Sequence, residues 1–289
     1  MTKYSFIILH YNSTDDTHAC VNSIVENCRN DDFRIYIVDN ASPNGSGKAL
    51  IAKYKHFGNI QIILSEVNLG FSKGNNLGIN QACLDGYSDF IVVLNNDTKL
   101  IQKNFCNLIK NCFDYSNFAV LGPTIYTPIG RTSINPGRKY ILKGRELDTW
   151  ENFYRKGLSS LKEKKLIKLK VLQKIMGIKR RLRSLHRRKF KYTENCVLHG
   201  CCLIFSKKFF EKFDGFDPRT FLYFEEEILY AHVMKAGLKS VYAPEIEIWH
   251  KEDGATDSIF ENNLKKTAFF YEHVLDSIKT YRSVLTEEY

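Results

Sequence analysis

The stretch "DFIVVLNNDT" (89–98) decides the fold class of this chain. It begins with a short apolar run rich in Ile and Val, which is typical of a strand covered on both faces. It then changes at once to two carboxamides and one carboxylate, Asn95, Asn96 and Asp97. In open α/β sheets, ligands bind beyond the carboxyl ends of the strands. The stretch therefore predicts a buried strand that ends in a binding site.

Three similar apolar runs come earlier in the chain, "YSFIILH" (4–10), "RIYIVD" (34–39) and "IQIILS" (60–65). The segments between the runs, 14–29, 45–57 and 72–86, are each long enough for a helix. This alternation predicts βαβ units and a Rossmann-like sheet flanked by helices. Two of the runs also end in polar residues, so we expect residues 95–97 to lie near His10, Tyr11, Asn12, Asp39 and Asn40.

The second half of the chain continues with fewer strands. "NCVLHGCCLIF" (195–205) predicts a strand, and "SKKFFEKFDGFDP" (206–218) predicts a helical turn that ends at Gly215. A helix is expected over 225–237 with Gly237 as its stop, followed by a pair of short strands in 239–250 and a closing helix over 259–285. Residues 128–150 carry Gly and Pro and are expected to form a loop.

The composition is that of a folded globular protein. Apolar residues make up 44% of the 289 residues and aromatic residues 13%, which excludes wholesale disorder and suits one large domain. The apolar runs are far shorter than the roughly 20 residues needed to cross a bilayer, and no cleavable signal pattern is present, so a cytoplasmic location is expected. The eight cysteines form no CxxC pair, and we expect reduced thiols rather than disulfides or a zinc site.

The net charge of +10 comes from one segment. Residues 151–191 contain 16 Lys or Arg and two acidic residues, a net charge of +14, whereas the rest of the chain carries −4. The segment's apolar residues approximate one helical face, including Leu158, Leu161, Leu166, Leu169, Leu172 and Ile175. We favour an amphipathic helix on anionic lipid, anchored by Trp150, Phe153 and Tyr154. The alternatives are a solvated helical face and a nucleic-acid arm, against which the shortage of aromatic residues counts.

Two polar stretches suit a nucleotide. Asp39 can accept a hydrogen bond from a base N–H or a ribose hydroxyl, and the alternative is that it caps the next helix; Asn12 has the same two interpretations. "NLGFSKGNNLGI" (68–79) places Gly70, Gly74 and three asparagines near a helix N-terminus, which suits a phosphate or a nucleoside edge. The alternative there is a structural turn.

Three further features suit a catalytic centre. Asp97 can give a hard divalent cation one oxygen ligand, and the alternative is a turn aspartate. His250 ends a strand and is either structural or a metal ligand beside Asp97. Glu225, Glu226 and Glu227 begin a helix after a mostly aromatic stretch, "FLYF". Carboxylates are favoured at a helix start, but an apolar shelf also raises the pKa of a carboxylate and suits a general base.

Taken in order, "IILHYN", "VDNAS", "NLGFSKGNNLGI", "LNNDT" and the long block from "GCCLIF" to "EIEIWH" resemble the inverting GT-A glycosyltransferases of family 2. The resemblance is to bacterial rhamnosyltransferase-like members that assemble surface polysaccharides. It covers about residues 3–125 and 195–252, and it leaves out the basic segment and the C-terminal helix.

The resemblance implies a role for each matching residue. Donor binding would fall to His10, Tyr11, Asn12, Asp39, Asn68, Gly70, Phe71, Gly74, Asn75, Asn95 and Asn96. Asp97 and His250 would hold Mg²⁺ or Mn²⁺ against the donor diphosphate, and Glu226 would be the general base, with Glu225 as the fallback. The sequence departs from the family pattern at Asn95, where relatives carry Asp, and at Ile228, where many carry a further Asp.

The implied partners are a nucleoside-diphosphate sugar, either dTDP-rhamnose or a UDP-hexose, and a lipid-linked saccharide at the anionic inner leaflet of the plasma membrane. No nucleic acid is expected, and a homodimer is left open. The expected division is a nucleotide-sugar half (1–127), a loop with the basic insertion (128–194), a catalytic half (195–252) and a helical extension (253–289). A sugar-nucleotide-binding protein, a nucleotidyltransferase and a nucleic-acid module are the alternatives.

Overall fold

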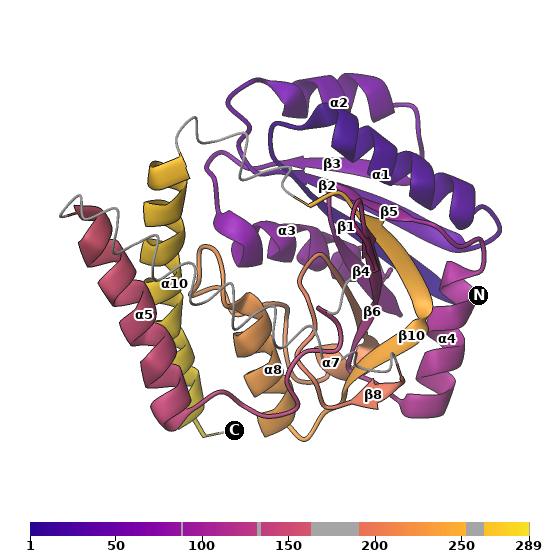
Figure 1. Ribbon diagram of the computed structural model, residues 1–289. Coiled ribbons are helices and arrows are strands. Elements are labelled where there is room, and N and C mark those ends of the chain that lie inside the picture. Colours follow the sequence, from indigo (N-terminus) through magenta and orange to yellow (C-terminus); the bar gives the residue numbers. More distant parts are fainter. Residues whose placement is uncertain (88, 132–133, 163–190, 253–262, 289) are drawn as a thin grey trace.

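The computed structural model describes residues 1–87, 89–131, 134–162, 191–252 and 263–288. Within them, ten strands form one mixed sheet, and helices cover both of its faces (Figure 1). The main path of the sheet runs β3-β2-β1-β4-β9-β6-β10-β5. This is the Rossmann-like mixed sheet that the sequence predicts.

The first half of the chain forms the parallel part of the sheet. Strands β1 (Lys3–His10), β2 (Asp32–Asp39), β3 (Ile60–Leu64) and β4 (Phe90–Asn95) alternate with helices α1 (Thr14–Asn27), α2 (Ser46–Tyr54) and α3 (Gly70–Leu84). The expected strands and helices of this half are confirmed to within three residues at each end. Their register places the carboxyl ends of β1, β2 and β4 at one edge.

Antiparallel pairing joins the second half to the first. Strand β9 (Cys202–Ser206) lies between β4 and β6 (Val120–Thr127) and is antiparallel to both. Strand β10 (Ser240–His250) runs parallel to β6, and its end pairs with β5 (Thr98–Leu100). The short β7 (Gly130–Arg131) and β8 (Thr193–Glu194) pair with β6 and β10.

Several details of the second half differ from the sequence expectations. Residues 195–201 are not a strand, and 239–250 holds one strand instead of two, because a register shift between Ala243 and Glu247 lets β10 pass Pro244 without ending. Helix α4 (Phe105–Ser116) and strand β6 were not predicted at all. The helical turn is α7 (Lys207–Phe210), and the helix expected over 225–237 is α8 (Glu225–Lys235).

Alternation along the strands creates a core on each face of the sheet. In β1, Phe6 and Ile8 face the core that α1, α2 and α4 cover, whereas Ile7 faces the core under α3, α7 and α8. Continuous apolar runs are what a strand covered on both sides requires. The side chains exposed at the ends of these strands are therefore the ones available for chemistry.

Helix α3 lies unusually close to its neighbours because glycines line one side of it. A Cβ at Gly74 or Gly78 would lie 2.7 Å from Leu9 Cδ1 or 2.5 Å from Ile7 Cγ2, so both positions exclude a larger residue. Gly70 has a positive φ of 74° and approaches the carbonyl of Phe221, which also accepts the N–H of Phe71. These contacts tie the first helix turn to the second half of the chain.

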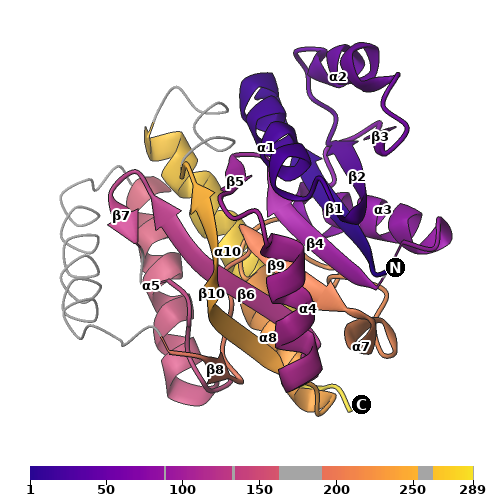
Figure 2. The ribbon, with the colours of Figure 1, turned by 90° about the vertical axis from the view of Figure 1, so that its right-hand side faces the viewer.

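A third core lies outside the sheet, where α5 (Gly144–Lys162) and α10 (Asn263–Thr286) stand side by side against α8 (Figures 1 and 2). The expected loop over 128–150 is wrong at its end, because helix α5 already begins at Gly144. The proposed lipid-facing residues Trp150, Phe153, Tyr154, Leu158 and Leu161 belong to this core, so they are corrected to packing residues. Leu166, Leu169, Leu172 and Ile175 lie outside the described residues.

All eight cysteines are free, as the sequence predicts. Cys28, Asp31 and Cys106 bring ligand atoms within 4.8 Å of one another at the end of α1 and the start of α4, an arrangement that the spacing of the cysteines did not suggest. The contact with the Cys28 thiol and burial raise the pKa of the Cys106 thiol, which favours the protonated thiol there.

No helix among the described residues has both the length and the apolar character of a membrane span.

Replacing Gly70 tests the close approach of α3 to the second half of the chain. Gly70→Ala should lower the free energy of unfolding by about 2 to 4 kcal/mol, because a methyl group adds steric overlap to the strain of a positive φ. Gly45→Ala is the matched control, since Gly45 has nearly the same φ of 73° and open space around it. Urea denaturation measures the free energy of unfolding of both variants. An equal loss in Gly70→Ala and Gly45→Ala would show that the close approach to Phe221 adds nothing to the cost of the positive φ.

Candidate active site

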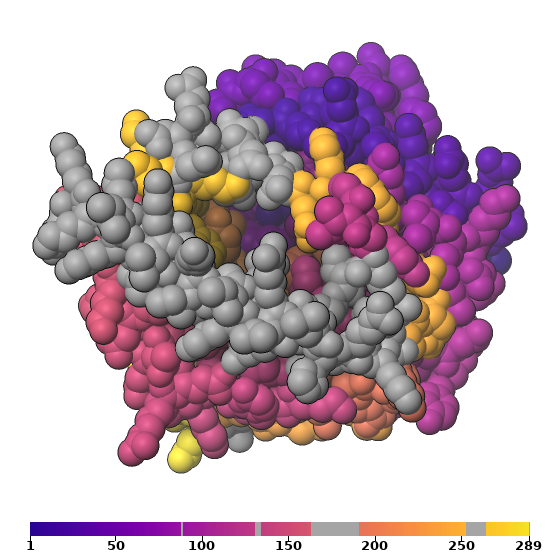
Figure 3. All heavy atoms as spheres, viewed as in Figure 1, coloured from indigo at the N-terminus to yellow at the C-terminus, as the bar shows by residue number. Residues whose placement is uncertain are grey.

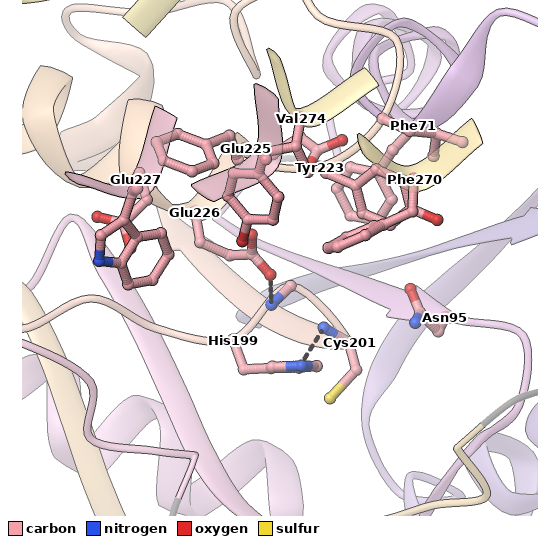
Figure 4. A pocket seen from close by; sticks show the side chains of 15 residues that line it. Phe71, Asn95, His199, Cys201, Tyr223, Glu225, Glu226, Glu227, Phe270 and Val274 are labelled. Carbon is pink, nitrogen blue, oxygen red and sulfur yellow. Dashed lines mark hydrogen bonds between the residues drawn. The ribbon is translucent and has the colours of Figure 1, made fainter. Parts of the chain in front are cut away.

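A pocket of about 370 Å³ opens at the carboxyl edge of the sheet, beside the start of α8. The space-filling view shows a hollow in this face between α10 and the end of β10 (Figure 3). Its wall is aromatic on the side of α5 and α10 and polar toward the sheet (Figure 4). The lining residues include Phe71, Asn95, Trp150, Tyr154, His199, Tyr223, Phe224, Glu225, Glu226, Glu227 and Phe270.

Backbone geometry turns the start of α8 toward this pocket. Tyr223 and Phe224, the two residues before the helix, have positive φ values of 69° and 71°. Non-glycine residues adopt this region at a cost, so strain is concentrated next to the three glutamates. Phe224 packs in the third core and also lines the pocket, which holds the helix start in place.

The three glutamates have three different surroundings. Glu225 is buried and its Oε1 has no hydrogen bond within the described chain; burial, and then the charge of Glu226, raise its pKa to about 8. Glu227 forms an ion pair with Arg138, whose guanidinium lies 5.2 Å from the centre of the Trp150 ring. Burial raises the pKa of Glu227, and the charge of Arg138 opposes that shift.

Glu226 is oriented by one contact from the strand side of the pocket. Its Oε1 accepts a hydrogen bond from the backbone N–H of Gly200 at 3.1 Å (Figure 4). A Cβ at Gly200 would lie 3.1 Å from the same oxygen, so glycine leaves room for this approach. Of the three glutamates, Glu226 therefore has a pocket-lining carboxylate that is oriented by a backbone N–H and is paired to no cation of the described residues.

Asp97 and His250 meet where β5 pairs with the end of β10. Thr98 lies opposite His250 in this antiparallel pair, which brings Asp97 Oδ1 to 3.2 Å from His250 Nε2. Both side chains are nearly buried, and His250 Nδ1 has no partner among the described residues. Two adjacent ligands of one divalent cation, each about 2.1 Å from it, would lie about 3 Å apart. The pair therefore has the spacing of two ligands of one metal ion, one a carboxylate oxygen and the other an imidazole nitrogen.

The remaining residues of "LNNDT" divide between pocket and interior. Asn95 lines the pocket near His199 (Figure 4). Asn96 is buried and donates from Nδ2 to the Ser13 carbonyl at 3.3 Å and to Thr17 Oγ1 at 3.1 Å. The side-chain NH2 group of Asn96 is therefore used inside the protein, and contact of Asn96 with the donor sugar nucleotide stays a prediction.

His10 also proves to be interior. Its side chain is fully buried, with Nδ1 2.7 Å from Thr17 Oγ1 and Nε2 2.7 Å from Ser46 Oγ. Burial lowers the pKa of the imidazole. Lining of the donor by the His10 side chain is contradicted, because both ring nitrogens are occupied. Its Nε2 instead lies 3.9 Å from Asp39 Oδ1, on the inner side of that carboxylate.

Asp39 does not cap the next helix. Its Oδ1 accepts from the N–H of Ser42 at 3.3 Å, whereas α2 begins after Gly45 and has no side-chain cap. A Cβ at Gly47 would overlap Asp39 Oδ2, so the carboxylate lies directly beside the first turn of α2. Asn12 has a positive φ of 62°, and its buried Oδ1 lacks a partner among the described residues. Both residues remain donor candidates, as does the half-buried Tyr11.

The stretch 68–79 combines a structural turn with two ligand candidates. Asn68 Oδ1 accepts from Gly70 N at 2.9 Å and from Asn40 Nδ2 at 3.0 Å, which favours the structural alternative for Asn68. Gly70 and Gly74 serve close packing, as described above. Asn75 is different, because its buried Oδ1 has no partner in the described chain, and Phe71 lines the pocket.

The sequence analysis gave Asn40 no role beyond its place at a strand end, and it missed Arg138 and His199. Asn40 ties the end of β2 to the turn before α3, accepting from Leu69 N at 2.8 Å. Arg138 pairs with Glu227 across a distance of 89 positions in the sequence, and His199 lines the pocket beside Glu226. The place of Asn40 at a strand end was predicted, whereas nothing in the local sequence marked Arg138 or His199.

Comparison with known proteins agrees with this geometry. Residues 5–214 match the family model described as glycosyl transferase family 2. An N-acetylglucosaminyl-diphospho-decaprenol L-rhamnosyltransferase of Mycobacterium tuberculosis (strain CDC 1551 / Oshkosh) is 24% identical over 231 residues. That match covers 77% of this chain and 67% of the relative. The protein of the same name in strain ATCC 25618 / H37Rv matches equally well.

Solved structures share the fold. S. aureus TarS superposes with a TM-score of 0.53 and 14% identity over 86% of this chain, which spans only 36% of TarS. The structure of GalNAc-T7 with UDP, GalNAc and Mn²⁺ gives a TM-score of 0.56 and 12% identity, covering 96% of this chain and 50% of GalNAc-T7. The family match covers most of the chain, and the mixed sheet has the architecture of these neighbours. The chain belongs to glycosyl transferase family 2 and is a glycosyltransferase with the GT-A fold.

Proposed function

We propose that the protein transfers a sugar, with inversion, from a nucleoside-diphosphate donor to a hydroxyl of a lipid-linked saccharide. The observation that carries the proposal is the placement of Glu226 and the Asp97–His250 pair about one carboxyl edge of the sheet. Such a reaction needs a base for the acceptor and a positive charge for the leaving diphosphate, in separate places. The two groups supply these needs from α8 and from the β5–β10 pair.

Unpaired polar atoms mark the donor side. Asn12 Oδ1 and Asn75 Oδ1 are buried without a hydrogen bond to any described residue, and Asp39 lies at the same edge. Buried polar groups are nearly always paired in a folded protein, so unpaired ones indicate a ligand that completes them. Base and ribose contacts are assigned to these residues together with Tyr11.

Asp97 and His250 are proposed as the ligands of Mg²⁺ or Mn²⁺. When bound, such an ion supplies positive charge to the donor diphosphate and stabilises it as a leaving group. The Mn²⁺ in the GalNAc-T7 structure supports this choice for the shared fold. Asn95 lines the pocket where relatives carry a second carboxylate, which leaves Asp97 as the single carboxylate of the motif.

Glu226 is proposed as the general base. It would take the proton of the acceptor hydroxyl as that oxygen attacks the anomeric carbon from the face opposite the nucleoside diphosphate. Glu225, whose raised pKa favours the neutral acid, and Glu227, which is paired with Arg138, are less suited to accept a proton. The hydrogen bond from Gly200 holds the Glu226 carboxylate toward the pocket.

The acceptor side is proposed to be the aromatic wall formed by Trp150, Tyr154, Tyr223, Phe224 and Phe270. Flat apolar rings suit the faces of a saccharide. The M. tuberculosis relative is named for a lipid-diphosphate-linked N-acetylglucosamine acceptor and a rhamnosyl donor, which supports a similar pair here. The 12 Lys or Arg in residues 163–190 support contact with an anionic membrane surface. dTDP-rhamnose and UDP-hexoses are the donor candidates.

Replacing Glu226 tests the assignment of the base. Glu226→Gln should lower kcat for transfer by about 10²- to 10⁴-fold with little change in donor KM, because the amide cannot accept the proton. Glu225→Gln is the matched control and should retain most of the activity. Transfer to a synthetic polyprenyl-diphosphate N-acetylglucosamine would be measured with dTDP-rhamnose and the UDP-hexoses. Normal transfer by Glu226→Gln together with inactive Glu225→Gln would show that the assignment is wrong.

The pKa of Glu225 predicts a pH-dependent stability. A folded-state value of about 8, against about 4.3 in an unfolded chain, means that the folded state alone holds this proton between the two values. The wild type should therefore lose stability as pH rises through this window. Glu225→Gln lacks this loss, so its melting temperature should rise relative to the wild type from pH 5 to pH 8. Differential scanning fluorimetry with EDTA checks this, and a constant difference between the two curves would contradict it.

Removing Asp97 tests donor and metal sites together. Mn²⁺ with the cognate nucleotide sugar should raise the melting temperature of the wild type but not of Asp97→Ala, because stabilisation requires ligand binding to the folded state. Asp114→Ala is the control, since Asp114 is exposed and pairs with Lys110 on α4. A panel of dTDP-rhamnose and UDP-sugars, with and without Mn²⁺, identifies the donor. An equal shift in Asp97→Ala would exclude Asp97 as a ligand.

A further inference from the structure

His199 belongs to a short segment that connects the two chemical centres. It precedes Gly200, whose N–H holds Glu226 (Figure 4), and its ring centre lies 6.1 Å from that of His250. Asn135 Oδ1 accepts the backbone N–H of His199 at 2.9 Å, and Asn135 is itself buried. The segment is therefore fixed from behind, while the imidazole lines the pocket.

One hydrogen bond determines which ring nitrogen of His199 carries the proton. Nδ1 lies 3.2 Å from the backbone N–H of Cys201 and must accept from it, since an amide nitrogen only donates. The proton of the neutral ring is therefore on Nε2. Among the described residues, none hydrogen-bonds to Nε2, so the ring offers one N–H donor in a half-buried position.

The position of the ring limits which part of the substrates the Nε2–H group of His199 can contact. If a metal ion bound by Asp97 and His250 holds the diphosphate and Glu226 meets the acceptor, the transferred sugar must lie between these two groups. The anomeric carbon is bonded to the leaving oxygen and faces the attacking one. His199 is next to both centres. The nucleoside contacts, by contrast, belong to the ends of β1 and β2.

We propose that His199 determines donor specificity by donating a hydrogen bond from Nε2 to a hydroxyl of the transferred sugar. This inference rests on the proposed function and adds a residue that neither the family motifs nor the comparisons assign. A fixed N–H group in a pocket discriminates between sugars that differ at one hydroxyl, because a bound sugar without that hydroxyl covers the N–H and leaves it unpaired.

The test compares His199→Phe, which keeps a planar ring without the N–H, with His199→Gln, whose amide can place an N–H at a similar reach. The first measurement is binding with Mn²⁺, comparing dTDP with dTDP-rhamnose and UDP with UDP-glucose, UDP-galactose and UDP-N-acetylglucosamine. His199→Phe should bind the nucleoside diphosphates as the wild type does, but lose about 10- to 100-fold in affinity for the preferred nucleotide sugar. His199→Gln should recover much of that loss.

The second measurement is kcat/KM for transfer across the same donors. His199→Phe should reduce the preference between donors that differ at one hydroxyl, and the loss should appear mainly in KM. Equal weakening of nucleoside diphosphate and nucleotide sugar would place His199 at the diphosphate and overturn the proposal. A loss confined to kcat and equal for all donors would show that it acts through Glu226, and would also overturn it. If the wild type binds nucleotide sugars without transferring them, the proposed function fails while the binding comparison still decides the role of His199.

Discussion

The antiparallel pairing of β5 with the end of β10 is the constraint on which the rest of the site depends. It brings His250 beside Asp97, although 153 positions separate them in the sequence. Strand β9, antiparallel to both β4 and β6, joins the parallel half of the sheet to β6 and β10. Each half alone would hold only one member of the pair. The mixed sheet therefore places a histidine of the second half beside the single aspartate of the first.

A second constraint acts at the start of α8, where three consecutive carboxylates have three different environments. The positive φ values of Tyr223 and Phe224 turn the helix start, so that Glu225 is directed into the protein and Glu227 toward Arg138. Glu226 lines the pocket between them, held by Gly200. Helix geometry separates neighbouring side chains by about 100°, so adjacent residues cannot share one environment. Burial raises the pKa of both Glu225 and Glu227, and for Glu227 the charge of Arg138 opposes that shift.

Beneath the strand ends lies a buried network that makes no contact with the pocket. Hydrogen bonds join Asn96, Thr17, His10 and Ser46 in that order, and His10 Nε2 lies 3.9 Å from Asp39 Oδ1 on the inner side of the carboxylate. These residues satisfy the polar groups that strand ends would otherwise bury unpaired. Asn12 and Asn75 differ from this network, because the buried Oδ1 atom of each has no hydrogen-bond partner among the described residues.

The sequence by itself determined the parallel half of the sheet, the helix at 225–237 and the edge at which the site would lie. Hydrophobic periodicity is a local property, so "DFIVVLNNDT" predicts a buried strand by itself. The carboxyl ends of parallel strands share one edge of a sheet, so the same stretch also predicts the edge at which the site lies. Local pattern could not tell whether His10 or Asn96 faces a ligand or the interior, because a polar residue at a strand end can do either. Nor could it show that the aromatic residues at 150–154 pack in a third core instead of facing lipid. Only the tertiary structure decided these points, and with them the places of Arg138 and His199, because burial and pairing depend on partners that are distant in sequence.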